Sequence, residues 1–238
     1  HATPRGRPAP LAIVGMGCRF PGADNLAQFW NLLIEGRSAL GEIPEERLDR
    51  SIYYHPAKGV RGRVYSTAGA VVEYPPLDPA KCPSPRGLLL DADVVPLSLC
   101  QVAAEACRHA GMDPFDLPHR NVGVYLGHTC SGELGGDVMY SGCIEEAAQY
   151  LRTIDDLGRL TGGRADAVLA EAVSILRSRL RRRAPGGHPM APEGLSAPML
   201  SQAFGLTGPS LVLDAACASS FQALVLAARA LWLGRIDM

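Results

Sequence analysis

Residues 211–220 read Leu-Val-Leu-Asp-Ala-Ala-Cys-Ala-Ser-Ser, and they carry the clearest structural pattern in the chain. Its three opening apolar residues predict a short buried strand. The small residues that follow suit a tight turn from strand to helix, because larger side chains would collide with the sheet. Apolar residues on nearly every face then predict a buried helix that reaches Leu233. The stretch therefore predicts a strand, a tight turn and a helix, with Cys217 at the turn.

Cys217 is the candidate catalytic residue, and we expect it in the first turn of that helix. Unpaired N–H groups and the dipole at a helix N-terminus favour an anion, and so favour the thiolate form of a cysteine. A thiolate is a good nucleophile for acyl groups. From the residues alone a second interpretation stays open, in which Cys217 is a buried structural thiol like most unpaired cysteines.

Working outward, predicted strands alternate with predicted helices. Apolar runs predict strands over 11–17, 121–126 and 211–213, and helical periodicity predicts helices over 26–33, 95–110, 145–152, 164–183 and 198–204. Such alternation is typical of an α/β fold with a largely parallel sheet flanked by helices. We expect residues 1–10 to be a linker or tag and residues 11–238 to be the domain, with an irregular insertion over about 37–90.

Composition excludes several classes of protein. The 238 residues carry a net charge of −1, so no basic field indicates nucleic acid or an anionic membrane as a partner. No apolar stretch approaches the roughly 18 residues of a membrane span. Seven cysteines without a CxxC pair predict reduced thiols rather than disulfides or a zinc site. We therefore expect a cytoplasmic protein without a bound metal.

Three segments together resemble a known family. Asp-Ala-Ala-Cys-Ala-Ser-Ser at 214–220 resembles the nucleophile motif of the β-ketoacyl synthases. Ile-Val-Gly-Met-Gly-Cys-Arg-Phe-Pro-Gly at 13–22, followed by Phe29-Trp30, is similar to the start of the ketosynthase domain of type I polyketide synthases. Ser-Gln-Ala-Phe-Gly-Leu-Thr-Gly-Pro-Ser at 201–210 is similar to the segment that leads into the nucleophile strand. The order of the three matches indicates the N-terminal half of such a domain.

The resemblance implies a thiolase-like layered fold and an acyltransferase of the 3-oxoacyl-[acyl-carrier-protein] synthase type. Cys217 would accept an acyl group and pass it to the carbanion formed when malonyl-carrier protein loses carbon dioxide, in polyketide or fatty acid biosynthesis. No cofactor is expected in the domain itself, since substrates arrive on the phosphopantetheine of an acyl carrier protein. In relatives two histidines assist from the C-terminal half, which would begin after Met238, so this chain alone is expected to lack them. The expected partners are the carrier protein, that C-terminal half and a second copy in a homodimer.

Two alternatives and two further features remain. A ketosynthase-like partner subunit of the chain-length-factor type would not condense, although the presence of Cys217 argues against it. Gly15 and Gly17 after a predicted strand begin like a dinucleotide-binding loop, but the third glycine of that fingerprint is missing. His128 ends a predicted strand, and we interpret it as a hydrogen-bonded structural histidine. A position near the acyl pocket or a pairing with Cys217 is the alternative. The arginines of 177–183 are predicted to be a solvated helix end, with docking of an acidic carrier protein as the alternative.

Overall fold

The computed structural model describes residues 9–73, 94–119, 121–128, 133–179 and 192–238. The chain forms two compact units. The sheet unit comprises His1–Leu11, Asp78–Cys100 and Pro118–Met238. The N-terminal unit comprises Ala12–Leu77 and Gln101–Leu117.

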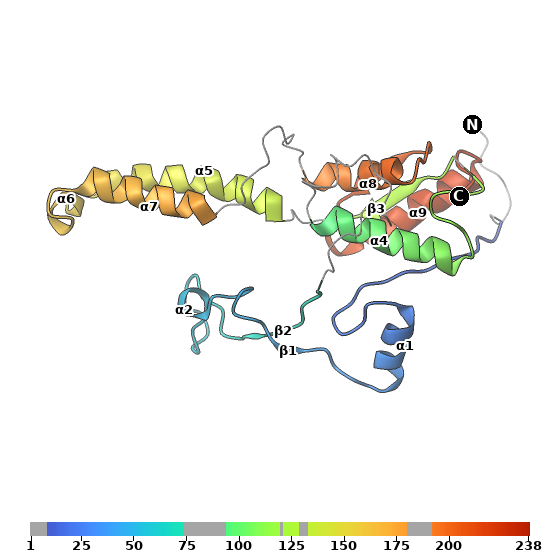
Figure 1. The fold of residues 1–238 in the computed structure, drawn as a ribbon, viewed down its shortest axis with the longest axis horizontal. Helices are drawn as coiled ribbons and strands as arrows, with labels where there is room; N and C mark the ends of the chain where they lie inside the picture. The colour runs from blue at the N-terminus through green and yellow to red at the C-terminus, as the bar shows by residue number, and fades with distance from the viewer. Residues whose placement is uncertain (1–8, 74–93, 120, 129–132, 180–191) are drawn as a thin grey trace. The chain divides into compact units, whose positions relative to one another are not determined.

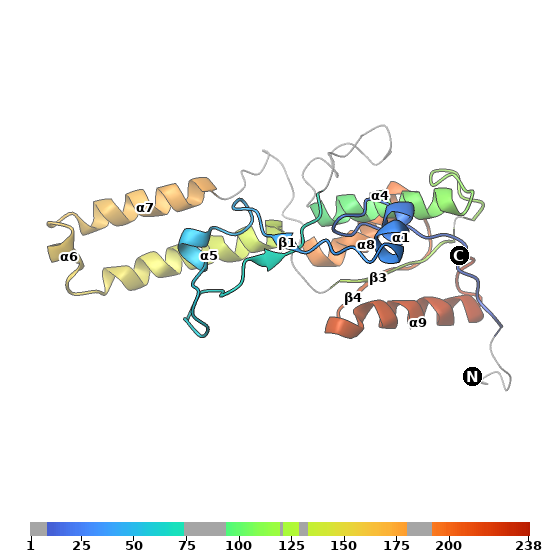
Figure 2. The same ribbon diagram turned by 90° about the horizontal axis from the view of Figure 1, so that it is seen from below.

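A parallel pair of strands organises the sheet unit. β3 (Val124–Gly127) pairs with β4 (Ser210–Leu213) in a register that sets Val124 opposite Ser210 and Gly127 opposite Leu213. Helices α8 (Pro192–Ala203) and α9 (Ser219–Trp232) both pack against the strands, and Figure 2 shows them on opposite faces of the pair. This arrangement confirms the prediction of parallel strands flanked by helices.

The segments that lead into β3 and β4 are packed closely against each other. A side chain at Gly208 would collide with the carbonyl group of Val122, because the segment before β4 lies directly against the segment before β3. The segment that follows α9 is tied to the residue before β3, since the N–H of Gly123 donates to the carbonyl oxygen of Met238 at 2.8 Å. Both the entry to the strands and the exit of the last helix are therefore fixed by backbone contacts.

α9 packs through one face only. Ala223 and Ala230 are buried, whereas Phe221 and Leu224 are 75% and 59% exposed. The sequence predicts a helix buried all round, and within the described part of the chain that prediction is wrong. The reason is that the strands cover a single side of the helix.

Three helices of the sheet unit come between β3 and α8 in the sequence. α5 (Glu133–Arg152), the short α6 (Leu157–Leu160) and α7 (Ala165–Arg179) form a hairpin in which α5 and α7 are in contact (Figure 1). Where the burial of its side chains is described, Ala148 and Leu169 are buried, and ion pairs join Arg152 to Asp166 and Arg177 to Glu145. The helices predicted at 145–152 and 164–183 are confirmed, although α5 begins twelve residues earlier and residues 180–183 lie outside the described ranges.

The N-terminal unit begins with a capped helix. In α1 (Leu26–Ile34) the side chain of Asn25 accepts a hydrogen bond from the N–H of Gln28 at 3.0 Å, as an N-cap does. The rings of Phe20 and Phe29 stack with their centroids 4.4 Å apart. The prediction of a helix capped at residue 24 or 25 is confirmed.

The insertion predicted over 37–90 contains short elements where it is described. β1 (Gly41–Glu42) pairs with β2 (Ala68–Gly69) in antiparallel fashion, and α2 (Arg50–Tyr53) lies between them in the chain. Arg50 forms ion pairs with Glu42 and Glu45 and also donates to the carbonyl oxygen of Ile43. These contacts hold a segment that has little apolar periodicity of its own.

The segment 11–17 is not the buried strand that the sequence predicts. It has no regular secondary structure, and Ile13 is 80% exposed. Its glycines instead lie against α4 (Val94–His109), where a Cβ atom at Gly15 would collide with the carbonyl oxygen of Ala106. Among the described residues no strand pairs with this segment, so its apolar run, although typical of a strand, is not part of a sheet.

We predict opposite effects for two glycine-to-alanine substitutions. Gly15→Ala should lower the free energy of unfolding by about 1–3 kcal/mol, because the new methyl group meets the α4 backbone. Gly142→Ala, on α5 with open space around it, should raise that free energy by about 0.5–1 kcal/mol through helix propensity. Urea-induced unfolding followed by circular dichroism measures both. Equal effects of the two substitutions would contradict the close approach of residues 11–17 to α4.

Candidate active site

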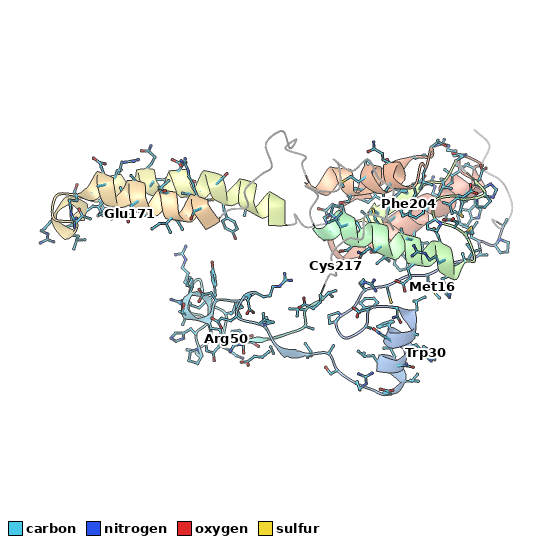
Figure 3. The ribbon with its side chains drawn as sticks, in the orientation of Figure 1. Met16, Trp30, Arg50, Glu171, Phe204 and Cys217 are labelled. Atoms are coloured by element: carbon cyan, nitrogen blue, oxygen red, sulfur yellow. The ribbon has the colours of Figure 1, made fainter. Side chains whose placement is uncertain are left out.

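The turn between β4 and α9 holds the candidate nucleophile. After Leu213 the chain passes through a single 3₁₀ turn, Ala216–Ala218, and enters α9 at Ser219. Cys217 is therefore in the 3₁₀ turn that precedes the helix, two residues before its first residue, rather than in the first turn of the helix as predicted. Figure 3 marks Cys217, whose side chain is exposed. The thiol thus lies at the N-terminal end of α9, where the helix dipole is positive.

Side-chain oxygens satisfy the backbone of this turn. The N–H of Ala215 donates to Oγ of Ser219 at 2.9 Å, and that hydroxyl donates to the carbonyl oxygen of Ala216 at 2.7 Å. The N–H of Ala216 donates to Oδ1 of Asp214 at 3.0 Å. These bonds therefore fix the N–H groups of Ala215 and Ala216 and the carbonyl group of Ala216, directly before Cys217 in the chain.

Ala216 has an unusual backbone conformation. Its φ of 48° makes it the one residue other than glycine with positive φ in the described ranges. For an L-residue with a Cβ atom this region costs roughly 1–2 kcal/mol. Such strain persists only where surrounding contacts enforce it, and the hydrogen bonds of Asp214 and Ser219 do so here.

The end of β3 presses against the same turn. A Cβ atom at Gly127 would lie 2.5 Å from the backbone nitrogen of Ser220 and 2.7 Å from the carbonyl carbon of Ser219. The next residue, His128, donates its N–H to the carbonyl oxygen of Leu213 at 3.1 Å. The carboxyl ends of both strands therefore meet the start of α9, which is where open α/β sheets bind ligands.

His128 differs from the prediction. The sequence predicts a hydrogen-bonded histidine, but within the described structure its Nδ1 atom is buried and has no hydrogen-bond partner. Only the backbone of His128 is tied to the neighbouring strand. The structure thus places His128 beside the turn but assigns its ring no role.

The cysteines divide by exposure. Cys18 and Cys100 are buried, Cys107 is half-buried, and Cys143 and Cys217 are exposed. Burial, together with the negative charge of Glu105, raises the pKa of the Cys18 thiol, and burial also raises the pKa of Cys107. The remaining two cysteines, Cys82 and Cys130, lie outside the described residues.

The other candidate features carry no second site. Arg177 pairs with Glu145, which favours the structural interpretation for that arginine, while Arg181–Arg183 are not among the described residues. Within the ranges described, no three His, Cys, Asp or Glu side chains gather as metal ligands would. In the same ranges no helix combines the length and the apolar character needed to cross a membrane.

Sequence reasoning singled out Cys217 as the candidate nucleophile and missed the groups that shape its turn. Ser219 and Gly127 carry no chemical signature of their own, and only their contacts reveal them. The run of small residues at 214–220 was the available signal, because it indicates a turn that admits no bulk. It does not indicate which hydroxyl bonds which carbonyl.

We predict that exposure and pKa order the cysteines in their reactivity. At neutral pH iodoacetamide should alkylate Cys217 and Cys143 first, because both are exposed. Cys18 should react only slowly and should accelerate at a pH above the ordinary thiol range, since its pKa is raised. Peptide mass spectrometry over time and pH gives each rate. Early alkylation of Cys18 or Cys100 in folded protein would contradict the packing described above.

Comparison with known proteins identifies the family. Residues 9–238 match the family described as β-ketoacyl synthase, N-terminal domain. The chain is 31% identical over 232 residues to a mycocerosic acid synthase-like polyketide synthase of Mycolicibacterium smegmatis, covering 97% of this chain and 9% of that protein. It is 28% identical over 237 residues to the highly reducing polyketide synthase cnsI of Penicillium expansum, covering 97% of this chain and 8% of that protein. The chain thus spans about a tenth of the length of these relatives.

Solved structures agree with the sequence matches. The oxazolomycin ketosynthase domain OzmH KS7 of Streptomyces albus superposes with a TM-score of 0.66 at 28% identity, over 94% of this chain and 32% of that one. The PfaC ketosynthase–chain length factor shares the fold with a TM-score of 0.68 at 21% identity, over 95% of this chain and 23% of that one. The thiolase-like fold expected from the resemblance is confirmed. The chain belongs to the β-ketoacyl synthase family, as the N-terminal domain of a ketosynthase of the type I polyketide synthase kind.

Proposed function

We propose that this chain supplies the nucleophile of a β-ketoacyl synthase that performs decarboxylative Claisen condensation. The observation that carries the proposal is the position of Cys217, exposed at the N-terminal end of α9 in a turn fixed by hydrogen bonds. Membership of the ketosynthase family supports it, since the relatives are named polyketide synthases. The substrates are an acyl group and a malonyl group, each on the phosphopantetheine of an acyl carrier protein.

The first half-reaction transfers the acyl group to the protein. Sγ of Cys217, as a thiolate, attacks the carbonyl carbon of the acyl thioester. The tetrahedral intermediate collapses with loss of the pantetheine thiolate, which takes up a proton, and the acyl group remains on Cys217 as a thioester. A thioester suits this step because sulfur is both a strong nucleophile and a good leaving group.

The second half-reaction forms the carbon–carbon bond. Malonyl-carrier protein loses carbon dioxide, and the electron pair of the broken bond becomes a carbanion stabilised as an enolate. The carbanion attacks the acyl carbon on Cys217, and the Cys217 thiolate leaves. The product is a β-ketoacyl group on the carrier protein, and the thiolate is regenerated.

Backbone donors near Cys217 support charge stabilisation in both steps. Among the described residues of the turn, the N–H groups of Ala215, Ala216 and Ala218 are bonded, which leaves that of Cys217 as the donor nearest the sulfur. A free N–H at a helix N-terminus is suited to an oxyanion, because the donor is oriented before charge develops. We assign that N–H to the tetrahedral oxyanion.

Residues beyond this chain complete the proposal. By resemblance, two histidines of the C-terminal half assist decarboxylation, and the domain acts as a homodimer with the carrier protein as its transient partner. The dinucleotide-binding alternative loses its basis, because Gly15 and Gly17 lie against the α4 backbone. No observation favours the alternative of a partner subunit that does not condense.

We predict that Cys217→Ser abolishes acyl loading. In full-length protein incubated with acyl-carrier protein, peptide mass spectrometry should find the acyl mass on the peptide that contains Cys217. The variant should lose that adduct, with condensation falling roughly a hundredfold or more. Cys143→Ser is the matched control, because it removes another exposed thiol from the same unit and should leave both unchanged. Loading that persists in Cys217→Ser and disappears in Cys143→Ser would refute the assignment.

A further inference from the structure

We propose that Ser219 is a positioning residue whose hydroxyl holds Cys217 in its reactive orientation. The inference rests on the proposed function, because it assumes that Cys217 is the nucleophile. Ser219 touches no substrate in this account. It acts through the backbone of the residue that precedes Cys217.

The Ser219 hydroxyl bridges two peptide groups of the turn. It accepts from the N–H of Ala215 at 2.9 Å and donates to the carbonyl oxygen of Ala216 at 2.7 Å. The side chain is itself enclosed, since Ser219 is only 4% exposed. Water therefore cannot readily replace either bond if the hydroxyl is removed.

The hydroxyl does not serve as an ordinary helix cap. A capping side chain sits at the N-cap and accepts from an N–H further along the helix. Ser219 is the first residue of α9, and Ala218, the N-cap, has no side-chain bond. The Ser219 hydroxyl instead points back to residues that come before the helix. Its bonds therefore hold the turn rather than the helix.

The bridge fixes the peptide that leads into Cys217. Ala216 has a φ of 48°, which an alanine does not favour. Its carbonyl oxygen accepts from both the N–H and the hydroxyl of Ser219, and its N–H is bonded to Asp214. Rotation of this peptide would carry with it the N–H and the Cα atom of Cys217. Losing the hydroxyl should therefore misplace the thiol without removing it.

The neighbouring serine provides a matched control. Ser220 is exposed and lies next to Ser219 in the same helix. Ser220→Ala changes the same atoms as Ser219→Ala, one residue further on, but leaves the bridge intact. Ser219→Thr keeps the hydroxyl and is the conservative variant for rescue.

The experiment compares these variants in the full-length protein by two readouts. In single-turnover acyl loading, Ser219→Ala should lower the maximum rate roughly 10- to 100-fold with an unchanged half-saturating concentration of acyl-carrier protein, because only orientation is lost. In alkylation of Cys217 by iodoacetamide, the profile of rate against pH should shift in Ser219→Ala. Ser220→Ala should match the wild type in both, and Ser219→Thr should recover most of the loading rate.

Three results would overturn the inference. They are a folded Ser219→Ala that loads and alkylates like the wild type, an equal loss in Ser220→Ala, and a Ser219→Ala that no longer unfolds cooperatively. The last result would mean that the hydroxyl holds the fold and not the nucleophile. If wild-type protein loads no acyl group on Cys217, the proposed function fails, and the alkylation profile still decides whether Ser219 orients the thiol.

Discussion

The tight passage from β4 into α9 is the constraint on which the rest of the site depends. Two parallel strands end side by side, and the helix begins so close to them that Gly127 has no room for a Cβ atom against Ser220. A turn this short must be made of small residues, and one of them, Ala216, takes a left-handed conformation. The contacts that enforce this conformation also set the direction of the next residue, Cys217. The packing of the backbone in this turn therefore also determines where the sulfur of Cys217 lies.

The same geometry gives the turn its chemical character. Because the N–H groups of Ala215, Ala216 and Ala218 are bonded within the turn, the donor left beside the sulfur among the described residues is the N–H of Cys217. Negative charge that develops near Cys217 would meet this N–H group and the positive end of α9. Such a site is well suited to passing acyl groups between sulfur atoms, in which charge appears on oxygen and then disappears.

The sequence predicted features whose cause is local and missed those whose cause is distant. The Asn25 cap, the β4 strand and the small residues around Cys217 follow from neighbouring residues, and the structure confirms them. The segment 11–17 has the composition of a strand, but its glycines serve contact with α4, which is some ninety residues away. The role of Ser219 was hidden for a related reason, because a serine after a turn is ordinarily a helix cap. Only the structure shows that its hydroxyl bonds to Ala215 and Ala216, which come before the helix.

The central claim is that the β4–α9 turn presents the sulfur of Cys217 and its own N–H to the same acyl group. A crystal structure of the full-length protein after acyl loading tests it most directly. We predict a thioester on Sγ of Cys217, its carbonyl oxygen within hydrogen-bonding distance of the N–H of Cys217, and the Ser219 hydroxyl still between Ala215 and Ala216. An acyl group on a different residue, or a thioester oxygen directed away from the start of α9, would contradict the account.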